Sequence, residues 1–412
     1  MAETADKTKA PEVWRREMVE ALKAPGALNG MELPARLERA LLEVPRHLFA
    51  PGADLEAAHS PFTAVETKQD ERGVALSSVS APQVQAMMLA QARVEPGMRV
   101  LELGSGGYNA ALIAELAGPS GHVASVDIDP EVTERARKLL AEAGYPQVQV
   151  VTADGTDGLP EQAPFDRIVV TAGAWDIPPA WRAQLTGTGR LVVPLRMRSL
   201  TRSVAFQRRG ERLVGDSALI CGFVPMQGAG ARAEQVVLAN GDESVGLRFD
   251  DGAPADPSLL DNAVRGPRTE VWSGVEVGRQ EPVMGLQLYL ATHLSGFCLM
   301  SVDPEADTGP VRPSNPYFSM AAVQGDSFAY LLVRRTPDGE DVEYGVHAFG
   351  ARGAELADEV CGLLAAWDRL HRGGPGPQIT AYPASTPDEE LEGDTVIDKE
   401  HVRITLAWPK GA

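Results

Sequence analysis

The chain has 412 residues, of which 44% are hydrophobic and 23% are charged, a composition typical of a globular rather than a disordered protein. Its formal net charge of −19 repels phosphate backbones, so we expect no nucleic-acid partner. No apolar run approaches the roughly 18 residues that span a membrane, and the N-terminus lacks the apolar core of a signal peptide, so we expect a soluble, cytoplasmic protein without a membrane partner.

The first elements along the chain are helical. Apolar periodicity predicts helices within residues 12–43, with a break at APGALNG. The stretch VPRHLFAPG (44–52) is typical of a turn-rich connection, and residues 53–76 are irregular and polar. A further helix is expected in APQVQAMMLAQARV, where Pro82 lies in the first turn and its missing N–H costs nothing.

From residue 99 onward, strands and helices alternate. We expect strands at 99–103, 122–128, 148–154, 165–173 and 189–195, and helices at 108–117, 130–144 and 178–185. Nearly continuous apolar strands that alternate with helices indicate a parallel sheet covered on both faces, which is an α/β fold. Two further strands, 202–207 and 212–224, are joined by the turn RRGE and predict an antiparallel pair.

The second half of the chain has a different pattern of predicted strands and helices. We expect strands near 234–239, 269–277, 328–335 and 402–408, and a helix at 351–374 with one apolar face. No repeat or catalytic signature stands out there. The predicted domains are therefore residues 1–228, comprising a helical and substrate-loop segment (1–81) and a cofactor-binding sheet (82–228), and a C-terminal α+β domain at 229–412.

The stretch VLELGSGGYNAALIAEL (100–116) crowds three glycines between a predicted strand and a predicted helix. Glycine lets a ligand approach the backbone closely, although many such turns use glycine for packing alone. Asp127 ends the next strand and is suited to grip ribose hydroxyls, while Asp154 and Gly155 end the strand after it. Polar groups at one carboxyl edge predict a nucleotide-like ligand.

The residues around the glycines indicate which ligand. A dinucleotide fingerprint needs G-x-G-x-x-G, and this chain reads Gly-Ser-Gly-Gly-Tyr-Asn from Gly104. Glu102 would repel a phosphate and suits a ligand with a cationic amino-acid end. S-adenosylmethionine (AdoMet) has a ribose, an adenine, an ammonium group and no phosphate. The three cysteines, Cys221, Cys298 and Cys361, show no ligand spacing, so we expect no metal.

Several stretches in order resemble the protein-L-isoaspartate O-methyltransferase family, from about residue 15 to about residue 227. They are VPRHLFAPG, SSVSAPQVQAMML, VLELGSGG, VASVDIDPE, TADGTDGLPEQAPFDRIVVTAG, IPPAWRAQL, GRLVVPL and GFVPM. The resemblance implies a Rossmann-like class I AdoMet-dependent methyltransferase fold, AdoMet as methyl donor and S-adenosyl-L-homocysteine as product.

The resemblance also implies roles for single residues. Asp127 would bind the ribose, Asp154 with Gly155 the adenine, and Ser80 would lie between methyl donor and acceptor carboxylate as the catalytic hydroxyl. Ser78 and Ser80 could instead cap the helix that starts near Pro82. The implied cofactor-binding residues are Ser80, Gln83, Glu102, Gly104, Ser105, Gly106, Gly107, Asp127, Ile128, Asp154, Gly155 and Thr171, with Glu102 and the turn holding the methionine end.

Three departures from the family pattern favour one branch of it. The glycine turn is one residue shorter, so Gly107 would replace the last glycine. His59 stands where the family usually has an acidic residue before the substrate loop, although it could also be an ordinary surface residue. In addition, residues 229–412 follow the catalytic domain, and a repair enzyme does not need such an extension. These features fit enzymes that methylate an aspartate in a ribosomally made, modified and macrocyclic precursor peptide. The predicted substrate-binding residues are His59, Ser78, Tyr317 and Phe318.

The predicted chemistry needs no general base, because an aspartate or isoaspartate carboxylate is already ionised at pH 7. Alignment and desolvation of the carboxylate and the methyl group would supply the rate. The methyl ester could then close to a succinimide (aspartimide) and hydrolyse to isoaspartate. Alternatives are the repair enzyme acting on damaged proteins, a tRNA methyltransferase, which the acidic charge disfavours, and a non-catalytic AdoMet-binding subunit that presents a peptide.

Overall fold

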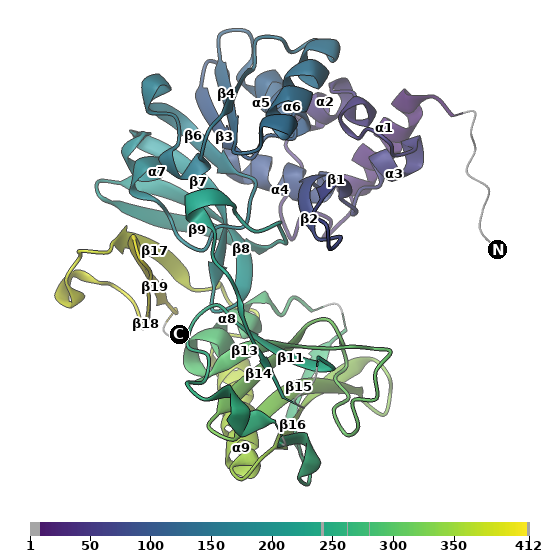
Figure 1. Ribbon diagram of the computed structural model, residues 1–412, viewed down its shortest axis with the longest axis vertical. Helices are drawn as coiled ribbons and strands as arrows, with labels where there is room; N and C mark the ends of the chain where they lie inside the picture. The colour runs from purple at the N-terminus through teal and green to yellow at the C-terminus, as the bar shows by residue number, and fades with distance from the viewer. Residues whose placement is uncertain (1–8, 240–242, 262, 280, 410–412) are drawn as a thin grey trace.

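A computed structural model describes residues 9–239, 243–261, 263–279 and 281–409. These residues form a ten-stranded sheet, a seven-stranded sheet and a two-stranded hairpin. In Figure 1 the N-terminal helices and the parallel strands occupy the upper part, the seven-stranded sheet lies below them, and the last strands of the chain return to the upper sheet at the left.

The N-terminal segment has more structure than its polar sequence indicates. Besides α1 (Pro11–Leu22) and α2 (Ala35–Glu43), it contains α3 (Leu55–His59) and a hairpin of β1 (Val65–Gln69) and β2 (Ala75–Val79). The expectation that residues 53–76 are irregular is therefore wrong. Aspartates form these short elements through local hydrogen bonds: Asp54 accepts from the Ala57 N–H at 2.8 Å, and Asp70 from the N–H groups of Arg72 and Val74.

The ten-stranded sheet has the order β18-β19-β17-β9-β8-β7-β6-β3-β4-β5. Neighbours from β7 to β5 are parallel and the remaining pairs are antiparallel, as the alternating pattern predicts. Its first strands and helices are α4 (Pro82–Ala92), β3 (Arg99–Leu103), α5 (Tyr108–Ala117), β4 (His122–Asp127), α6 (Pro130–Glu142), β5 (Gln149–Thr152), β6 (Phe165–Val170), α7 (Pro179–Ala183), β7 (Leu185–Met197), β8 (Leu200–Arg209) and β9 (Arg212–Ile220).

Side chains of the parallel strands alternate between two cores. Val100 of β3 packs into the cluster that also contains residues of α1, α2, α4, α5 and α6, whereas Leu101 and Leu103 pack into the opposite cluster with Trp181 of α7. The chain passes from β3 to β4 and β5 on one side and then returns to β6 on the other. The carboxyl ends of β3, β4 and β6 therefore flank the point where an open α/β sheet binds its ligand.

The seven-stranded sheet has the order β10-β11-β13-β14-β15-β16-β12 and is antiparallel throughout. Three of the four expected C-terminal strands, those near 234–239, 269–277 and 328–335, lie in this sheet, and the expected long helix is present. The strands β11, β13, β14 and β16 and the helix α8 are additions. The elements are β10 (Gln235–Leu238), β11 (Val245–Phe249), β12 (Thr269–Gly278), α8 (Met284–His293), β13 (Phe297–Val302), β14 (Ser319–Gln324), β15 (Ser327–Arg335), β16 (Asp341–Phe349) and α9 (Gly353–Leu370).

The last strands leave this sheet and extend the first one. β17 (Gln378–Pro383) pairs with β9 at Thr380↔Val214 and Ala381↔Leu213, and β19 (Val402–Ala407) joins β17 to β18 (Thr395–Asp398). The division of the chain into domains at residue 228 stays a prediction. The pairing shows that residues 378–407 belong to the sheet of the N-terminal half.

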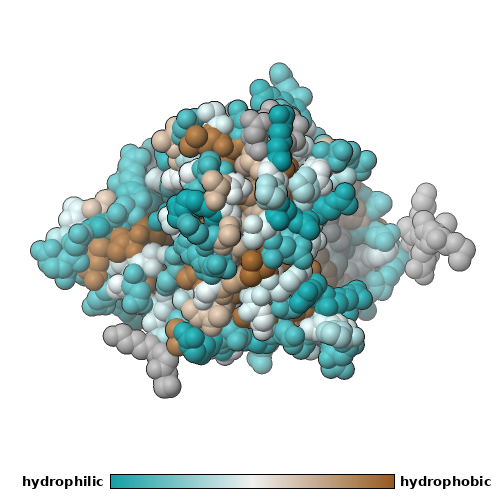
Figure 2. All heavy atoms as spheres, turned by 90° about the horizontal axis from the view of Figure 1, so that it is seen from below, coloured by the Kyte–Doolittle hydropathy of each residue, from teal (hydrophilic) through white to brown (hydrophobic). Residues whose placement is uncertain are grey.

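One apolar core connects the two sheets. Leu286 of α8 and Trp367 of α9 lie in the same cluster as Leu191 and Phe206 of the ten-stranded sheet. None of the helices in the described ranges is long and apolar enough to cross a membrane. Seen from below, hydrophilic and hydrophobic residues are mixed on the surface, and one of the hydrophobic groups forms a strip at the left, on the side of β17–β19 (Figure 2).

Candidate functional site

A cavity lies at the carboxyl ends of β3 and β4, the place where open α/β sheets bind their ligands. The hairpin, the glycine turn and the segment Val224–Gln227 each contribute part of its lining. Two contacts hold these parts in place: Lys68 of β1 pairs with Asp129 at 2.6 Å, and Gln227 Nε2 donates to the Leu76 carbonyl at 3.4 Å. The predicted residues that line it are Ser78, Ser80, Glu102, Gly104, Ser105, Gly106, Asp127, Ile128, Gly155 and Thr171.

The glycine turn requires glycine at two places. Gly104 has φ +104° and Gly107 has φ +87°, both in the region that L side chains rarely adopt. A Cβ at Gly104 would collide with the side chain of Thr171, and one at Gly107 would lie 3.0 Å from the ring of Phe49. Gly107 is also the residue that precedes α5. It packs against Phe49 and does not line the cavity, so the predicted contact between Gly107 and the cofactor is not observed.

Glu102 is fully buried at the base of the cavity. Its Oε1 accepts a hydrogen bond from Asn109 Nδ2 at 2.8 Å, and its Oε2 accepts one from the Ser125 hydroxyl. Burial raises the pKa of Glu102 to about 7, although both hydrogen bonds act to lower it. A cation bound beside this carboxyl group would favour its ionised form.

Asp127 organises the rim of the cavity above β4. Its two oxygens accept hydrogen bonds from the N–H groups of Ser105 at 2.8 Å and Asp129 at 2.9 Å. Each carboxylate oxygen can accept a second hydrogen bond, so this carboxylate can still receive ligand hydroxyls. The neighbouring Ser105 hydroxyl is buried and is without a hydrogen-bond partner among the described residues. An unpaired buried hydroxyl in the lining of a cavity indicates that a ligand completes its hydrogen bonding.

Ser80 lines the cavity just before α4, and the helix starts without its help. The residue preceding α4 is Ala81, and no side chain caps the helix, so the alternative capping role of Ser78 and Ser80 is not observed. The backbone of Ser80 is held instead by Arg46, which donates to its carbonyl at 2.8 Å and to Gln85 Oε1 at 2.8 Å. Burial lowers the pKa of Arg46 to about 10, so it remains charged at neutral pH.

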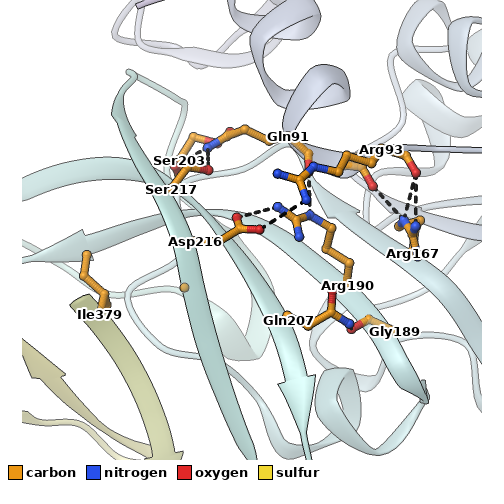
Figure 3. A network of polar contacts seen from close by, with 12 residues as sticks. Gln91, Arg93, Arg167, Gly189, Arg190, Ser203, Gln207, Asp216, Ser217 and Ile379 are labelled. Atoms are coloured by element: carbon orange, nitrogen blue, oxygen red, sulfur yellow. Dashed lines mark hydrogen bonds and ion pairs between the residues drawn. The ribbon is translucent and has the colours of Figure 1, made fainter. Parts of the chain in front are cut away.

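The opposite end of α4 is held by a polar network (Figure 3). The amide of Gln91 bonds both the carbonyl and the hydroxyl of Ser203 at 3.0 and 2.6 Å and reaches Ser217. Arg190 of β7 donates to the Gln91 carbonyl and pairs with Asp216. The bond from Arg190 satisfies one of the carbonyl groups that a helix C-terminus leaves free. Together these contacts fix α4, and with it Ser80, against the sheet.

Asp154 does not line the cavity. Its oxygens accept from the N–H and hydroxyl of Thr156 and, at 2.8 Å, from the Ala229 N–H. Partial burial acts to raise its pKa, but these hydrogen bonds outweigh it and lower the pKa below the usual range. The segment carrying Ala229 also brings Met226 to the cavity wall, beside Gly155. The region predicted for adenine is therefore bordered by Gly155, Ile128 and Met226, with Asp154 behind it.

Four other predicted residues are not brought to the cavity. His59 is 3% exposed, and its Nδ1 lies 2.7 Å from the Leu55 carbonyl within α3. It is neither a surface residue nor placed against a substrate in this cavity, because the short α3 packs it toward His47. Gln83 uses its N–H to bond the Pro61 carbonyl at 2.9 Å. Tyr317 and Phe318 lie in the loop before β14, beyond the cavity lining.

Sequence reasoning missed several residues that build the site. Asn109 and Ser125 complete the hydrogen bonding of Glu102, and Arg46 with Gln85 supports Ser80. The VPRHLF and SAPQVQ motifs contain Arg46 and Gln85, but only the tertiary contact reveals that they meet. Met226 lies in GFVPM, which carries the resemblance but has no local chemistry that assigns it to a ligand.

Comparisons with known proteins agree with this geometry. The family described as protein-L-isoaspartate(D-aspartate) O-methyltransferase matches residues 15–231, more than half of the chain. The protein-L-isoaspartate O-methyltransferase of Methanococcoides burtonii is 43% identical over 179 residues, covering 43% of this chain and 82% of its own length. That of Hyperthermus butylicus is 38% identical over 224 residues, covering 52% and 88%.

A solved structure described as protein-L-isoaspartate O-methyltransferase covers 89% of this chain and 96% of its own, with 21% identity and a TM-score of 0.49. The family match lies on the part of the chain that forms the cavity. The unpaired Ser105 hydroxyl, the carboxylates Glu102 and Asp127 and the apolar wall fit an AdoMet molecule. The chain belongs to the protein-L-isoaspartate O-methyltransferase family, and it is an AdoMet-dependent protein carboxyl O-methyltransferase.

Proposed function

We propose that this enzyme methylates the free α-carboxylate of L-isoaspartyl residues in proteins or peptides. The observation that carries the proposal is the position of Ser80 in the lining of a cavity that Glu102, Ser105 and Asp127 also line. The relatives that match the cavity-forming residues are named for this substrate. AdoMet, when bound, supplies an electrophilic methyl group.

Each part of AdoMet has a counterpart among the cavity residues. Asp127 would accept hydrogen bonds from the ribose hydroxyls, since each of its oxygens uses one acceptor position on a backbone N–H. Glu102 and the Ser105 hydroxyl would hold the amino-acid end. Ile128 and Met226 would enclose the adenine next to Gly155. Asp154 would act on the adenine only through the turn that it stabilises.

The acceptor requires positioning rather than deprotonation. A carboxylate is ionised at neutral pH, so the protein needs no general base. The Ser80 hydroxyl would donate one hydrogen bond to the carboxylate and leave the other oxygen directed at the methyl group. Arg46, which bonds the Ser80 carbonyl, fixes this hydroxyl by holding its backbone. Proximity and exclusion of water then supply the rate.

A matched pair of synthetic peptides tests the proposal. The two peptides have one sequence and differ only in an L-isoaspartyl or an L-aspartyl residue. We expect AdoMet-dependent gain of one methyl group, measured by mass spectrometry, on the isoaspartyl peptide only. Asp127→Ala should abolish AdoMet binding in a calorimetric titration and methylation with it. Methylation of the aspartyl peptide alone would contradict the proposal.

A second candidate function is methylation of an aspartate in a ribosomally made, modified precursor peptide, followed by closure to a succinimide. It is supported by residues 232–412, which lie outside the family match and would offer a surface for a constrained peptide. In this case Tyr317, which is 69% exposed, and Phe318 would contact the substrate. Macrocyclic peptides that gain a methyl group, while their linear forms and isoaspartyl peptides do not, would favour this function over the first.

A further inference from the structure

A second groove lies beside the ten-stranded sheet, between β9, α8 and the loop that leads into β17, where β17 separates from β9. Residues 215–218 of β9 form one side of it. Met284 and Leu288 of α8, Ile379 of β17 and Trp408 form the apolar part, and the loop containing Gly376 forms the rim. Asp216 is the one ionisable side chain among the described residues of the lining, and Arg190 and Arg93 neutralise it.

The outer edge of β9 is open along this groove. Pairing with β17 ends at Val214, and the next carbonyl, that of Gly215, accepts a hydrogen bond from the side chain of Gln378. The register of β9 against β8 shifts so that Asp216 is an extra residue, a β-bulge that bends the strand. Within the described ranges, no strand pairs with the outer edge from Asp216 to Leu219. The Ile220 carbonyl, which accepts from Asn29, marks the far end.

This edge leads toward the methyl-transfer cavity. β7 and β8 are antiparallel, as are β8 and β9, so β9 points in the same direction as β7 and the parallel strands. The carboxyl end of β9 is therefore at the sheet edge that carries the cavity. The chain itself covers the path from Ala218 to Pro225, a cavity residue, in seven positions. Because residues 221–224 are not part of a strand, an extended peptide at roughly 3.3 Å per residue would span the same path with at most about seven residues.

We propose that the open edge of β9 binds an extended segment of the polypeptide substrate as an added strand. The inference rests on the proposed function, because it assigns the occupant to the same polypeptide that carries the acceptor carboxylate. The main chain of the segment would pair with the free N–H and C=O groups at Asp216–Leu219, and alternate side chains would enter the groove. Because the groove is lined by apolar side chains and one neutralised carboxylate, it would select uncharged, apolar side chains within about seven residues of the acceptor.

Peptides of graded length test the edge. The probe is a short L-isoaspartyl peptide, alone or carrying about eight alternately apolar and polar residues on its amino-terminal or carboxyl-terminal side, long enough to pass the cavity and pair with the edge. We expect one of the two extensions to lower KM about tenfold, the effect of a few net hydrogen bonds and apolar contacts, with kcat unchanged. N-methylation of alternate residues of the extension should remove the gain in one of the two registers only, because successive N–H groups point in opposite directions.

Two glycine variants supply the matched control in the protein. A side chain at Gly376 would enter open space at the groove, and one at Gly187, on the exposed part of β7, would enter open space elsewhere. Gly376→Trp should remove the advantage of the extension and leave the KM of the short peptide unchanged. Gly187→Trp should behave as the parent protein does.

The outcomes separate this inference from the proposed function. If the short peptide is methylated and no extension lowers KM, the edge does not bind substrate and the proposed function still stands. The edge is equally excluded as a substrate site if both N-methyl registers, or both tryptophan variants, act alike. If no isoaspartyl peptide of any length is methylated, the proposed function fails and the assignment of the edge fails with it.

Discussion

Nearly all polar side chains of the site already form hydrogen bonds with other residues of the protein. Both oxygens of Glu102 accept hydrogen bonds from Asn109 and Ser125, and both oxygens of Asp127 accept backbone N–H groups. Such a network is rigid, because each lost partner leaves a buried polar group unsatisfied. The hydroxyl of Ser105, buried without a partner in the part of the chain that the structure describes, marks the place where a ligand completes the network.

Ser80→Ala should leave AdoMet affinity unchanged and reduce methyl transfer. Loss of one positioned hydrogen bond costs about 1–3 kcal/mol, which is roughly ten- to a hundredfold in rate. Calorimetry with AdoMet and steady-state kinetics measure the two effects. Ser77→Ala is the matched control, since Ser77 also lines the cavity but its hydroxyl is bonded to Thr67. Equal rates for the two variants would mean that Ser80 does not position the acceptor.

Glu102→Gln should change how stability depends on pH. Burial raises the pKa of Glu102 from its ordinary 4.5 to about 7, so the neutral acid stabilises the folded state. This contribution is fully present below pH 4.5 and is lost as the pH rises through 7. Without AdoMet, urea unfolding should show the variant gaining on the parent protein between these values, by at most about 3 kcal/mol. Parallel stability curves would contradict the burial of an ionisable Glu102.

The helix α4 connects the ten-stranded sheet to the part of the cavity lining that contains Ser80. Pro82 starts it immediately after Ser80 and Ala81, and Arg190 with Gln91 holds its end against β7 and β8. Buried along most of its length, this helix cannot move without breaking the polar network shown in Figure 3. The hairpin β1–β2 is held in a similar way, since Lys68 pairs with Asp129 at the start of α6.

Two arginines on Asp216 should differ sharply in their contribution to stability. Arg190 has a side chain that is 3% exposed, whereas that of Arg93 is 65% exposed and 3.6 Å from the carboxylate. Arg190→Met should lower the free energy of unfolding by about 1–3 kcal/mol, because it leaves the buried Gln91 carbonyl without its hydrogen bond. Arg93→Met should change it by less than about 1 kcal/mol. Urea unfolding of both variants measures the contrast, and similar losses would contradict the role given to Arg190.

The last three strands of the chain, β17, β18 and β19, complete the ten-stranded sheet that carries the cavity. Ile379, Ala381 and Ile404 lie in the same core cluster as Leu191 and Phe206. The family match ends at residue 231, but the hydrophobic core that supports the matched residues does not end there. The two halves of the chain therefore stabilise each other, and the groove between them adjoins both.

Removal of residues 377–412 should destabilise the N-terminal half as well as the C-terminal half. The truncated chain would expose the edge of β9 and the apolar surface under β17 and β19. We expect it to melt at a lower temperature by circular dichroism and to lose AdoMet binding at temperatures where the full chain retains it. An unchanged melting temperature would mean that β17–β19 contribute nothing to the catalytic sheet.

The sequence alone determined the elements whose pattern is local. Apolar runs placed β3 and α5 at their observed bounds, and the positive φ angles of Gly104 and Gly107 explain why the turn between them needs glycine. Motif order identified the family and the edge of the sheet that holds the cavity. These features depend on neighbours within a few positions, where side-chain periodicity and turn chemistry act.

The tertiary structure alone decided which distant residues meet. It buried His59, placed Asp154 behind the cavity wall, and brought Asn109, Ser125 and Met226 to the site. It also returned β17–β19 to the first sheet from far along the chain, as the pair Thr380↔Val214 shows. A strand's pattern records that one face is buried but not which strand lies beside it, because backbone pairing is nearly independent of sequence and is settled by the packing of the whole core.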